Sequence, residues 1–270
     1  MRKAVLALAI AACLLAGCSG SGGLFIGSSR PSQVDSAELQ FQTPAEGDPI
    51  AVISTSMGDI SIVLYPEYAP MAVENFTGLA GQGYFEGVTF HRVEKDFIIQ
   101  TGDATGTGQG GASIWQNRDY PIEYTPKLRH YAGAVALAAA SDGSVDNLSQ
   151  FYIVSCPADT IDRDSAQNLT DSGLPQQAVD TYRQVGGAPY LDGLDTVFGQ
   201  VYDGMDVVDA INAVETDENG RPLEDVSILS VTVGTYSAAN ATGSTSAASG
   251  TSAAESTASA AVSSAAGAAA

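Results

Sequence analysis

Basic residues and cysteines are scarce in this sequence. Lys and Arg number 11 among 270 residues, against 31 Asp and Glu, for a formal net charge of −20. Proteins that bind DNA or RNA through its phosphates need clustered Lys and Arg, so nucleic acid is excluded as a partner. Two His and three Cys are too few for a plausible metal cluster, and we expect neither a metal site nor a cofactor.

An apolar run at the N-terminus, residues 4–15, is too short to cross a bilayer, which takes about 20 residues. It follows Arg2 and Lys3 and ends in Leu-Ala-Gly-Cys at 15–18, which resembles a bacterial lipobox, where the chain is cut before the cysteine and lipid is attached to its sulfur. We therefore expect a signal peptide at 1–17, lipid (palmitate included) on Cys18, and an extracytoplasmic protein anchored to the cell membrane. The alternative is an ordinary signal peptide that contains a cysteine.

In the processed chain, the cysteine content excludes an intramolecular disulfide. Cys13 leaves with the signal peptide and Cys18 is acylated, which leaves Cys156 as the remaining thiol. Cys156 follows the strand-like run 151–154. A small buried thiol is expected there rather than a reactive one.

Composition divides the chain into four regions. Ser- and Gly-rich residues follow Cys18, and polar residues without periodicity continue from there, which predicts a lipid-anchored flexible linker at 18–48. Residues 237–270 are almost wholly Ala, Ser, Thr and Gly, which predicts a disordered tail. The region between them, 49–236, has the length of one domain.

Short strands dominate the secondary structure predicted for that domain. Residues 50–55 and 59–65 flank a Gly-containing turn and predict a hairpin. Further strand-like runs cover 88–93, 97–100, 134–138, 151–154, 196–202 and 226–233. Helices are predicted at 70–80, where apolar residues recur at helical spacing, and at 205–214. Many short strands with few helices favour a mainly antiparallel barrel over a doubly wound sheet.

Two segments are unusually informative: Phe-His-Arg-Val-Glu-Lys-Asp-Phe-Ile-Ile-Gln-Thr-Gly-Asp at 90–103 and Ser-Gln-Phe-Tyr-Ile at 149–153. Together with shorter motifs at 73–76, 84–88, 191–193 and 197–199, they resemble the cyclophilin family of peptidyl-prolyl cis-trans isomerases, in the family's order from about 50 to 233. The resemblance implies a mainly β fold, a closed eight-stranded antiparallel barrel capped by two helices. Residues 156–189 would be an extra, helix-containing insertion.

The resemblance also implies a site. Arg92 matches the family's catalytic arginine, and Phe97 and Gln100 match residues that act beside it. The implied substrate-binding positions are Ile98, Ala138, Ala139, Gln150, Tyr152, Tyr190, Leu191 and Asp195. Tyr190 stands where the family often has Trp, and Asp195 where it often has His. An acid near the groove could change which sequences bind.

These residue types suit rotation about an X-Pro bond. The twisted amide gains a lone pair on the prolyl nitrogen, and the guanidinium of Arg92, which is always protonated, can donate to that nitrogen or hold the carbonyl oxygen. Apolar side chains would bury the proline ring. We therefore expect a monomeric isomerase that acts on proline-containing exported polypeptides. The alternatives are a proline-peptide binding module or chaperone with little turnover, and a solute-binding or structural lipoprotein.

Three further features receive structural interpretations. Proline isomerisation needs no general base, so His91 is expected to make a structural hydrogen bond, and His130, which matches no motif, is expected to be exposed. Residues 106–111 fit G-x-G-x-x-G, but no strand and helix bracket them, which predicts a loop rather than a nucleotide site. A helical stripe that starts at Pro175 predicts a small helix packed on the barrel; a flap beside the groove is the alternative.

Overall fold

The structure is a computed structural model that describes residues 34, 36–138 and 147–241. The strands are β1 (Pro49–Thr55), β2 (Gly58–Leu64), β3 (Arg92–Glu94), β4 (Ile98–Thr101), β5 (Ala134–Leu137), β6 (Phe151–Val154), β7 (Val197–Asp203) and β8 (Ile228–Thr235). The α-helices are α1 (Pro70–Gly81), α2 (Arg163–Asp171), α3 (Gln176–Val185), α4 (Met205–Asn212) and α5 (Ala238–Ala241). Short 3-10 turns are η1 (Leu39–Phe41), η2 (Ala158–Thr160) and η3 (Pro189–Leu191). The predicted signal peptide, Cys18, Ala139 and most of the predicted tail lie outside the described residues.

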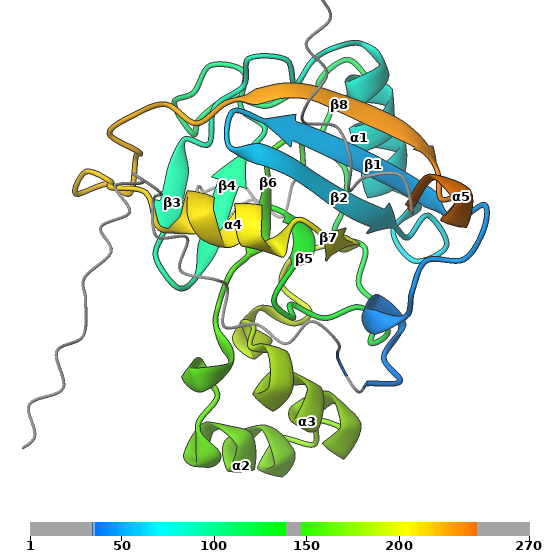
Figure 1. The fold of residues 1–270 in the computed structure, drawn as a ribbon, viewed down its shortest axis with the longest axis vertical. Coiled ribbons are helices and arrows are strands. Elements are labelled where there is room, and N and C mark those ends of the chain that lie inside the picture. The colour runs from blue at the N-terminus through cyan, green and yellow to red at the C-terminus, as the bar shows by residue number, and fades with distance from the viewer. Residues whose placement is uncertain (1–33, 35, 139–146, 242–270) are drawn as a thin grey trace, which may run out of the picture.

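The eight strands form one antiparallel sheet in the order β3-β4-β6-β5-β7-β2-β1-β8, and the sheet curls around a core (Figure 1). The mainly antiparallel β fold is thereby confirmed. A closed barrel is not supported, because among the described strands the edge strands β3 and β8 do not pair with each other. The segments that precede them do meet, through a bridge between Thr89 and Ser227 and a 2.9 Å bond from the amide of Phe90 to the carbonyl of Val226.

Helix α1 packs on the main hydrophobic core of this curled sheet. Pro70 begins the helix, where its missing N–H costs nothing. The carboxylate of Glu123 accepts from the next two backbone amides, of Met71 and Ala72, at 3.0 and 2.9 Å, and so caps the helix from a distant loop. On the inner face Phe76 packs against three other aromatic rings, those of Phe85, Phe151 and Phe198. These rings form the centre of the main core.

The insertion at 156–189 contains two helices instead of the predicted one. Helix α3 begins directly after Pro175, as the stripe predicts, and the side chain of Asp162 caps α2 by accepting from the amide of Ser165 at 2.8 Å. Both helices lie together below the sheet in Figure 1. Tyr182 of α3 is fully buried, with its ring centroid 4.4 Å from that of Tyr131. The insertion is therefore packed on the domain, which supports the packed helix over a flap.

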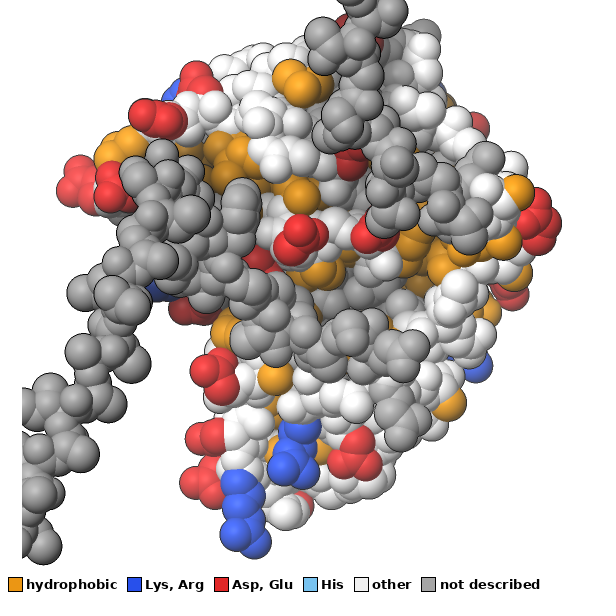
Figure 2. Space-filling model, viewed as in Figure 1, with side chains coloured by type: hydrophobic (Ala, Val, Ile, Leu, Met, Phe, Trp, Pro, Cys, Tyr) orange, Lys and Arg blue, Asp and Glu red, His pale blue; other side chains and the backbone are white. Residues whose placement is uncertain are grey.

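Charge is unevenly distributed over the face in view. Figure 2 shows acidic side chains spread across it, while the most prominent basic side chains are at its lower end, where α2 and α3 lie. No helix among the described residues is long and apolar enough to span a membrane.

The segment that precedes β1 corrects the predicted linker boundary. Gln40 is 4% exposed, and its side chain bonds the backbone of Arg129 in both directions, donating to the carbonyl at 2.9 Å and accepting from the amide at 2.7 Å. Phe41 packs on the ring of Tyr131 at 5.3 Å. Residues 38–42 thus belong to the packed domain, and the bonds of Gln40 offset the cost of burying its polar side chain. A polar sequence without periodicity did not reveal this.

Candidate active site

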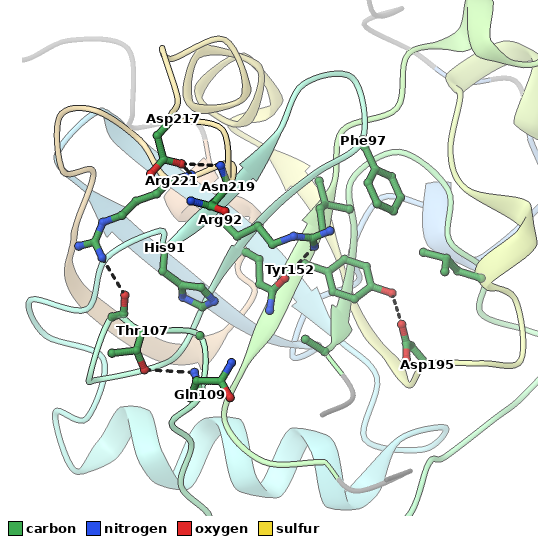
Figure 3. A pocket seen from close by; sticks show the side chains of 16 residues that line it. His91, Arg92, Phe97, Thr107, Gln109, Tyr152, Asp195, Asp217, Asn219 and Arg221 are labelled. Carbon is green, nitrogen blue, oxygen red and sulfur yellow. Dashed lines mark hydrogen bonds between the residues drawn. The ribbon is translucent and has the colours of Figure 1, made fainter. Parts of the chain in front are cut away.

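A groove of about 660 Å³ opens along β3, β4 and β6 (Figure 3). The elements around it are η3, the loop that follows β4, and a turn at 217–221. The lining residues are His91, Arg92, Phe97, Ile98, Gln100, Gly106, Thr107, Gly108, Gln109, Ala138, Tyr152, Leu191, Asp195, Asp217, Asn219 and Arg221. A proline side chain would occupy a small part of this volume, so the groove has room for an extended peptide.

A chain of hydrogen bonds between amide side chains holds Arg92, the arginine of the groove, in position. Arg92 on β3 lies opposite Gln100 on β4 in the strand register, and its Nη1 donates to Oε1 of Gln100 at 3.0 Å. Gln100 in turn donates to Gln150 at 2.9 Å. Gln150 donates to the carbonyls of Gly108 and Gly110 at 3.1 and 2.7 Å. Arg92 also forms an ion pair with Glu94, and its side chain remains 37% exposed.

That chain of hydrogen bonds ends at the Gly-rich loop 106–111, whose backbone is held by Asp103. Asp103 is fully buried, and its carboxylate accepts from the amides of Thr105, Thr107, Gly108 and Gly110 at 2.7–3.1 Å. Burial alone would raise the pKa of Asp103, but the hydrogen bonds from Thr105 and from the loop amides outweigh it and lower the pKa to about 2. The prediction of a loop at 106–111 is confirmed, and the loop forms one wall of the groove.

An apolar pocket adjoins the guanidinium. Ile98 and Tyr152 are 3% and 4% exposed, and Phe97 and Leu191 are half-buried beside them. The alternation of β4 directs Ile98 and Gln100 to the groove and places the intervening Ile99 in the core. The hydroxyl of Tyr152 donates to Asp195 at 2.7 Å, and burial together with that carboxylate raises the pKa of Tyr152 well above its ordinary value.

Helix α4 fixes the turn that carries Phe97. Asn212, its last residue, donates to the carbonyls of Glu94 and Ile98 at 2.8 and 3.3 Å. It also accepts from the amide of Asp96 at 2.8 Å, and Asp96 adopts a positive φ of 57° that the tight turn requires. Three bonds from one buried amide therefore set the position of Phe97 relative to Arg92.

The structure brings most of the residues predicted for the site into one groove. Arg92, Phe97, Ile98, Gln100, Ala138, Tyr152, Leu191 and Asp195 all line it. Gln150 lies behind the lining, bonded to Gln100. Tyr190 is 65% exposed at the rim, its ring centroid 6.1 Å from that of Phe97.

Comparison with known proteins agrees with this geometry. The family model for cyclophilin-type peptidyl-prolyl cis-trans isomerases matches residues 50–233. The chain belongs to this family. A Staphylococcus aureus (strain COL) protein named as a peptidyl-prolyl cis-trans isomerase is 40% identical over 188 residues, which cover 70% of this chain and 93% of that protein. A Cryptosporidium parvum cyclophilin, solved in the presence of the dipeptide Ala-Pro, matches with a TM-score of 0.55 and 28% identity over 68% of this chain and 98% of that one. The chain is thus a cyclophilin-type isomerase.

A longer relative shows the same domain in another context. A Streptococcus pyogenes serotype M6 protein, named as a bifunctional phosphatase and peptidyl-prolyl cis-trans isomerase, is 40% identical over 201 residues. The match covers 73% of this chain and 42% of that protein.

One wall of this cyclophilin's groove was missed by the sequence analysis. The turn at 217–221 is closed by Asp217, whose carboxylate accepts from the amides of Asn219 and Arg221 at 2.8 and 2.9 Å. The amide of Val93 bonds the carbonyl of Gly220 at 2.7 Å, which fixes the turn beside Arg92. The Asp-Glu-Asn-Gly sequence at 217–220 indicates a turn. Nothing local indicates that it lies beside Arg92, which precedes Asp217 by 125 residues.

Both histidines are buried. His91 lines the groove and is 8% exposed. Burial lowers the pKa of His91, and this outweighs the side chain of Gln150, which is close enough to the ring to raise the pKa. His130 is 1% exposed, which contradicts the expected surface position; Asp192 accepts from its backbone amide at 2.8 Å and lies 3.1 Å from its Nδ1. Cys156 is buried, as predicted.

Proposed function

We propose that Arg92 acts directly on the prolyl amide while the apolar pocket holds the proline ring. The observation that carries this proposal is the position of one guanidinium beside Phe97, Ile98, Tyr152 and Leu191 in a single groove. As the bond twists, the prolyl nitrogen gains a lone pair, and the fixed N–H groups of Arg92 can donate to it. Its bond to Gln100 orients the guanidinium across the groove.

Magnitudes require both parts of the site. The barrier to rotation is about 18–20 kcal/mol, and uncatalysed X-Pro bonds isomerise in tens to hundreds of seconds. Shortening this to milliseconds takes an acceleration of about 10⁴-fold, or about 5–6 kcal/mol. One hydrogen bond to a charged group contributes about 1.5–3 kcal/mol. The remainder comes from a pocket that binds the twisted state better than either planar isomer.

A proline-peptide isomerisation assay, run beside a peptide-binding titration, tests the mechanism. Arg92→Ala and Phe97→Ala should each lower kcat/KM by 10-fold or more. The matched control is Arg163→Ala, which removes an exposed arginine at the start of α2 and should leave the rate unchanged. Peptide binding by the wild-type protein without rate enhancement would select the binding module instead, and near-normal rates in both pocket variants would refute the mechanism.

We also propose that the isomerase works outside the cytoplasm, tethered to the cell membrane by lipid on Cys18, as a monomer that assists the folding of exported proteins. The lipobox-like residues 15–18 and the Ser/Gly-rich stretch after them support this location. A surface-tethered isomerase would meet proline-containing chains as they emerge unfolded. The client proteins are recognised through the groove and not through the lipid.

Cell fractionation tests the tether. The wild-type protein should sediment with membranes and carry the mass of a lipid on its first mature residue. Cys18→Ala should remain unlipidated and lose this attachment, while the assay on the purified protein should give an unchanged rate. A wild-type protein found in the cytoplasm with an unmodified Cys18 would overturn the proposal.

A further inference from the structure

The insertion at 156–189 is joined at both ends to elements that form the proline pocket. It starts directly after β6, which carries Tyr152, and there the amide of Ser155 bonds the carbonyl of Phe97 at 2.7 Å. It ends in η3, whose last residue is Leu191. Movement of the insertion would therefore be transmitted to the floor and to one wall of the pocket.

A largely buried carboxylate holds the second of these junctions in place. Asp192, the residue after Leu191, has an 11% exposed side chain. It lies 3.1 Å from Nδ1 of His130 and 3.2 Å from Nη1 of Arg129. The hydroxyl of Tyr182, from α3, donates to both of its oxygens at 2.9 Å. We call these four residues the Asp192 knot.

The knot also contacts the pocket floor. The ring of His130 stacks on the ring of Tyr152, with centroids 6.2 Å apart and planes 20° from parallel, within the range of favourable aromatic contacts. The backbone of His130 is tied to the end of the insertion, because its carbonyl accepts from the amide of Ala188 at 2.8 Å. One cluster thus contacts the floor residue Tyr152, the chain beside Leu191, and α3.

The segment between α3 and η3 is packed tightly against the backbone of neighbouring segments. Gly186 and Gly187 have φ values of 86° and 134°, and a Cβ on them would lie 2.2 and 2.4 Å from the carbonyls of Cys156 and His130. Two glycines are needed for so close an approach of backbone to backbone. A rotation of α3 would therefore be passed on to the wall rather than absorbed.

From this arrangement we infer that Tyr182 and Asp192 are positioning residues for proline binding. Through their hydrogen bond, the insertion holds Leu191 in its place at the side of the proline pocket. The inference rests on the site proposed above. The bond from Tyr182 to the charged Asp192 is of the strong, charge-assisted kind, and α3 contributes it from outside the part of the domain that forms the groove.

Tyr182→Phe tests the inference in the full-length protein, since it removes the hydroxyl and keeps the ring that packs on Tyr131. The expected result is a 3- to 10-fold weaker Kd for a proline-containing peptide, a similar rise in KM with kcat within 2-fold, and displaced NMR signals of the Leu191 methyl groups. Tyr131→Phe is the matched control, because it removes a hydroxyl from the same interface that is not bonded to Asp192. It should leave Kd, KM and the Leu191 signals unchanged.

Other outcomes overturn the inference. If Tyr182→Phe lowers only the melting temperature, and Kd and KM measured well below it equal those of the wild type, the bond has a structural role and the inference fails. Equal effects of the two variants would also refute it. Binding is measured apart from turnover, so a wild-type protein that binds peptide without catalysis would refute the proposed mechanism and still leave this test valid. Asp192→Asn, which leaves the charge of buried Arg129 uncompensated, should weaken binding further if it folds.

Discussion

Asp103→Asn removes one negative charge from the base of the groove loop and changes almost no volume. In the wild type, one carboxylate oxygen accepts from the amides of Thr107, Gly108 and Gly110, and the other from that of Thr105. An asparagine can keep its oxygen toward the three amides, but then its NH₂ group faces the amide of Thr105. In the variant, the acceptor of these hydrogen bonds is no longer charged, and the NH₂ group of the asparagine faces the N–H of Thr105, which is also a donor.

The pKa of Asp103 gives the size of the effect. A carboxyl with a pKa of about 2 in the folded protein and 3.8 in the unfolded chain stabilises the folded state by about 2 kcal/mol at pH 7. This stability is fully present above pH 4 to 5 and is lost as the pH falls through 3.8 toward 2. By pH 3 about 1 kcal/mol of it remains. Asparagine cannot ionise, so the variant should lack this contribution at every pH.

Denaturant unfolding of both proteins between pH 7 and pH 3 measures this difference. The free energy of unfolding of the variant should be about 2 kcal/mol lower at pH 7, and the gap should narrow by about half at pH 3. Because Gln150 is bonded to the carbonyls of this loop, kcat/KM should also fall. A gap that is absent at pH 7, or that keeps its full size at pH 3, would refute the role given to Asp103.

Two further predictions concern a tight backbone contact and a buried ring. Gly187→Ala would place a Cβ 2.4 Å from a backbone carbonyl, whereas the Cβ of Gly173→Ala, also at positive φ, would meet nothing within 4 Å. The first substitution should therefore lower the free energy of unfolding by about 1–3 kcal/mol more than the second. Equal losses would contradict the close packing at Gly187. Burial lowers the pKa of His91 from 6.5, so its protonation opposes folding: stability should fall as the pH drops below about 6.5, and His91→Gln should lessen this loss. A difference between the two proteins that does not vary between pH 7 and pH 5 would contradict it.

Motifs predicted the groove better than they predicted its supports. Arg92, Gln100 and Tyr152 lie close together because they come from the neighbouring strands β3, β4 and β6, and Phe97 lies in the turn between β3 and β4. The strand runs were also predicted to within a few residues, apart from 88–93, of which only Arg92 and Val93 fall in β3. The alternation of apolar and polar residues and the position of turn residues are local features of the sequence, and they were sufficient to predict these strands.

The supports depend on partners that are distant in sequence. His130 has no local signal of burial, since Asp192, which accepts its bonds, follows 62 residues later. Gln40 is buried by contacts with residues 89 and 160 positions away. Helix α2 has few apolar residues and was missed, although Asp162 provides a standard N-cap. Local patterns therefore locate the strands, while the buried polar contacts require the fold.

The central claim, that the guanidinium of Arg92 stabilises the twisted amide, is tested most directly by the rate of cis-trans exchange of a proline peptide bound to the protein. NMR exchange spectroscopy on Arg92→Lys measures this rate, because lysine keeps the charge and removes the planar fork. The account predicts exchange about 10- to 150-fold slower than in the wild type, as expected for the loss of about 1.5–3 kcal/mol, with Kd within about 3-fold. Exchange at the wild-type rate on the bound peptide would contradict it.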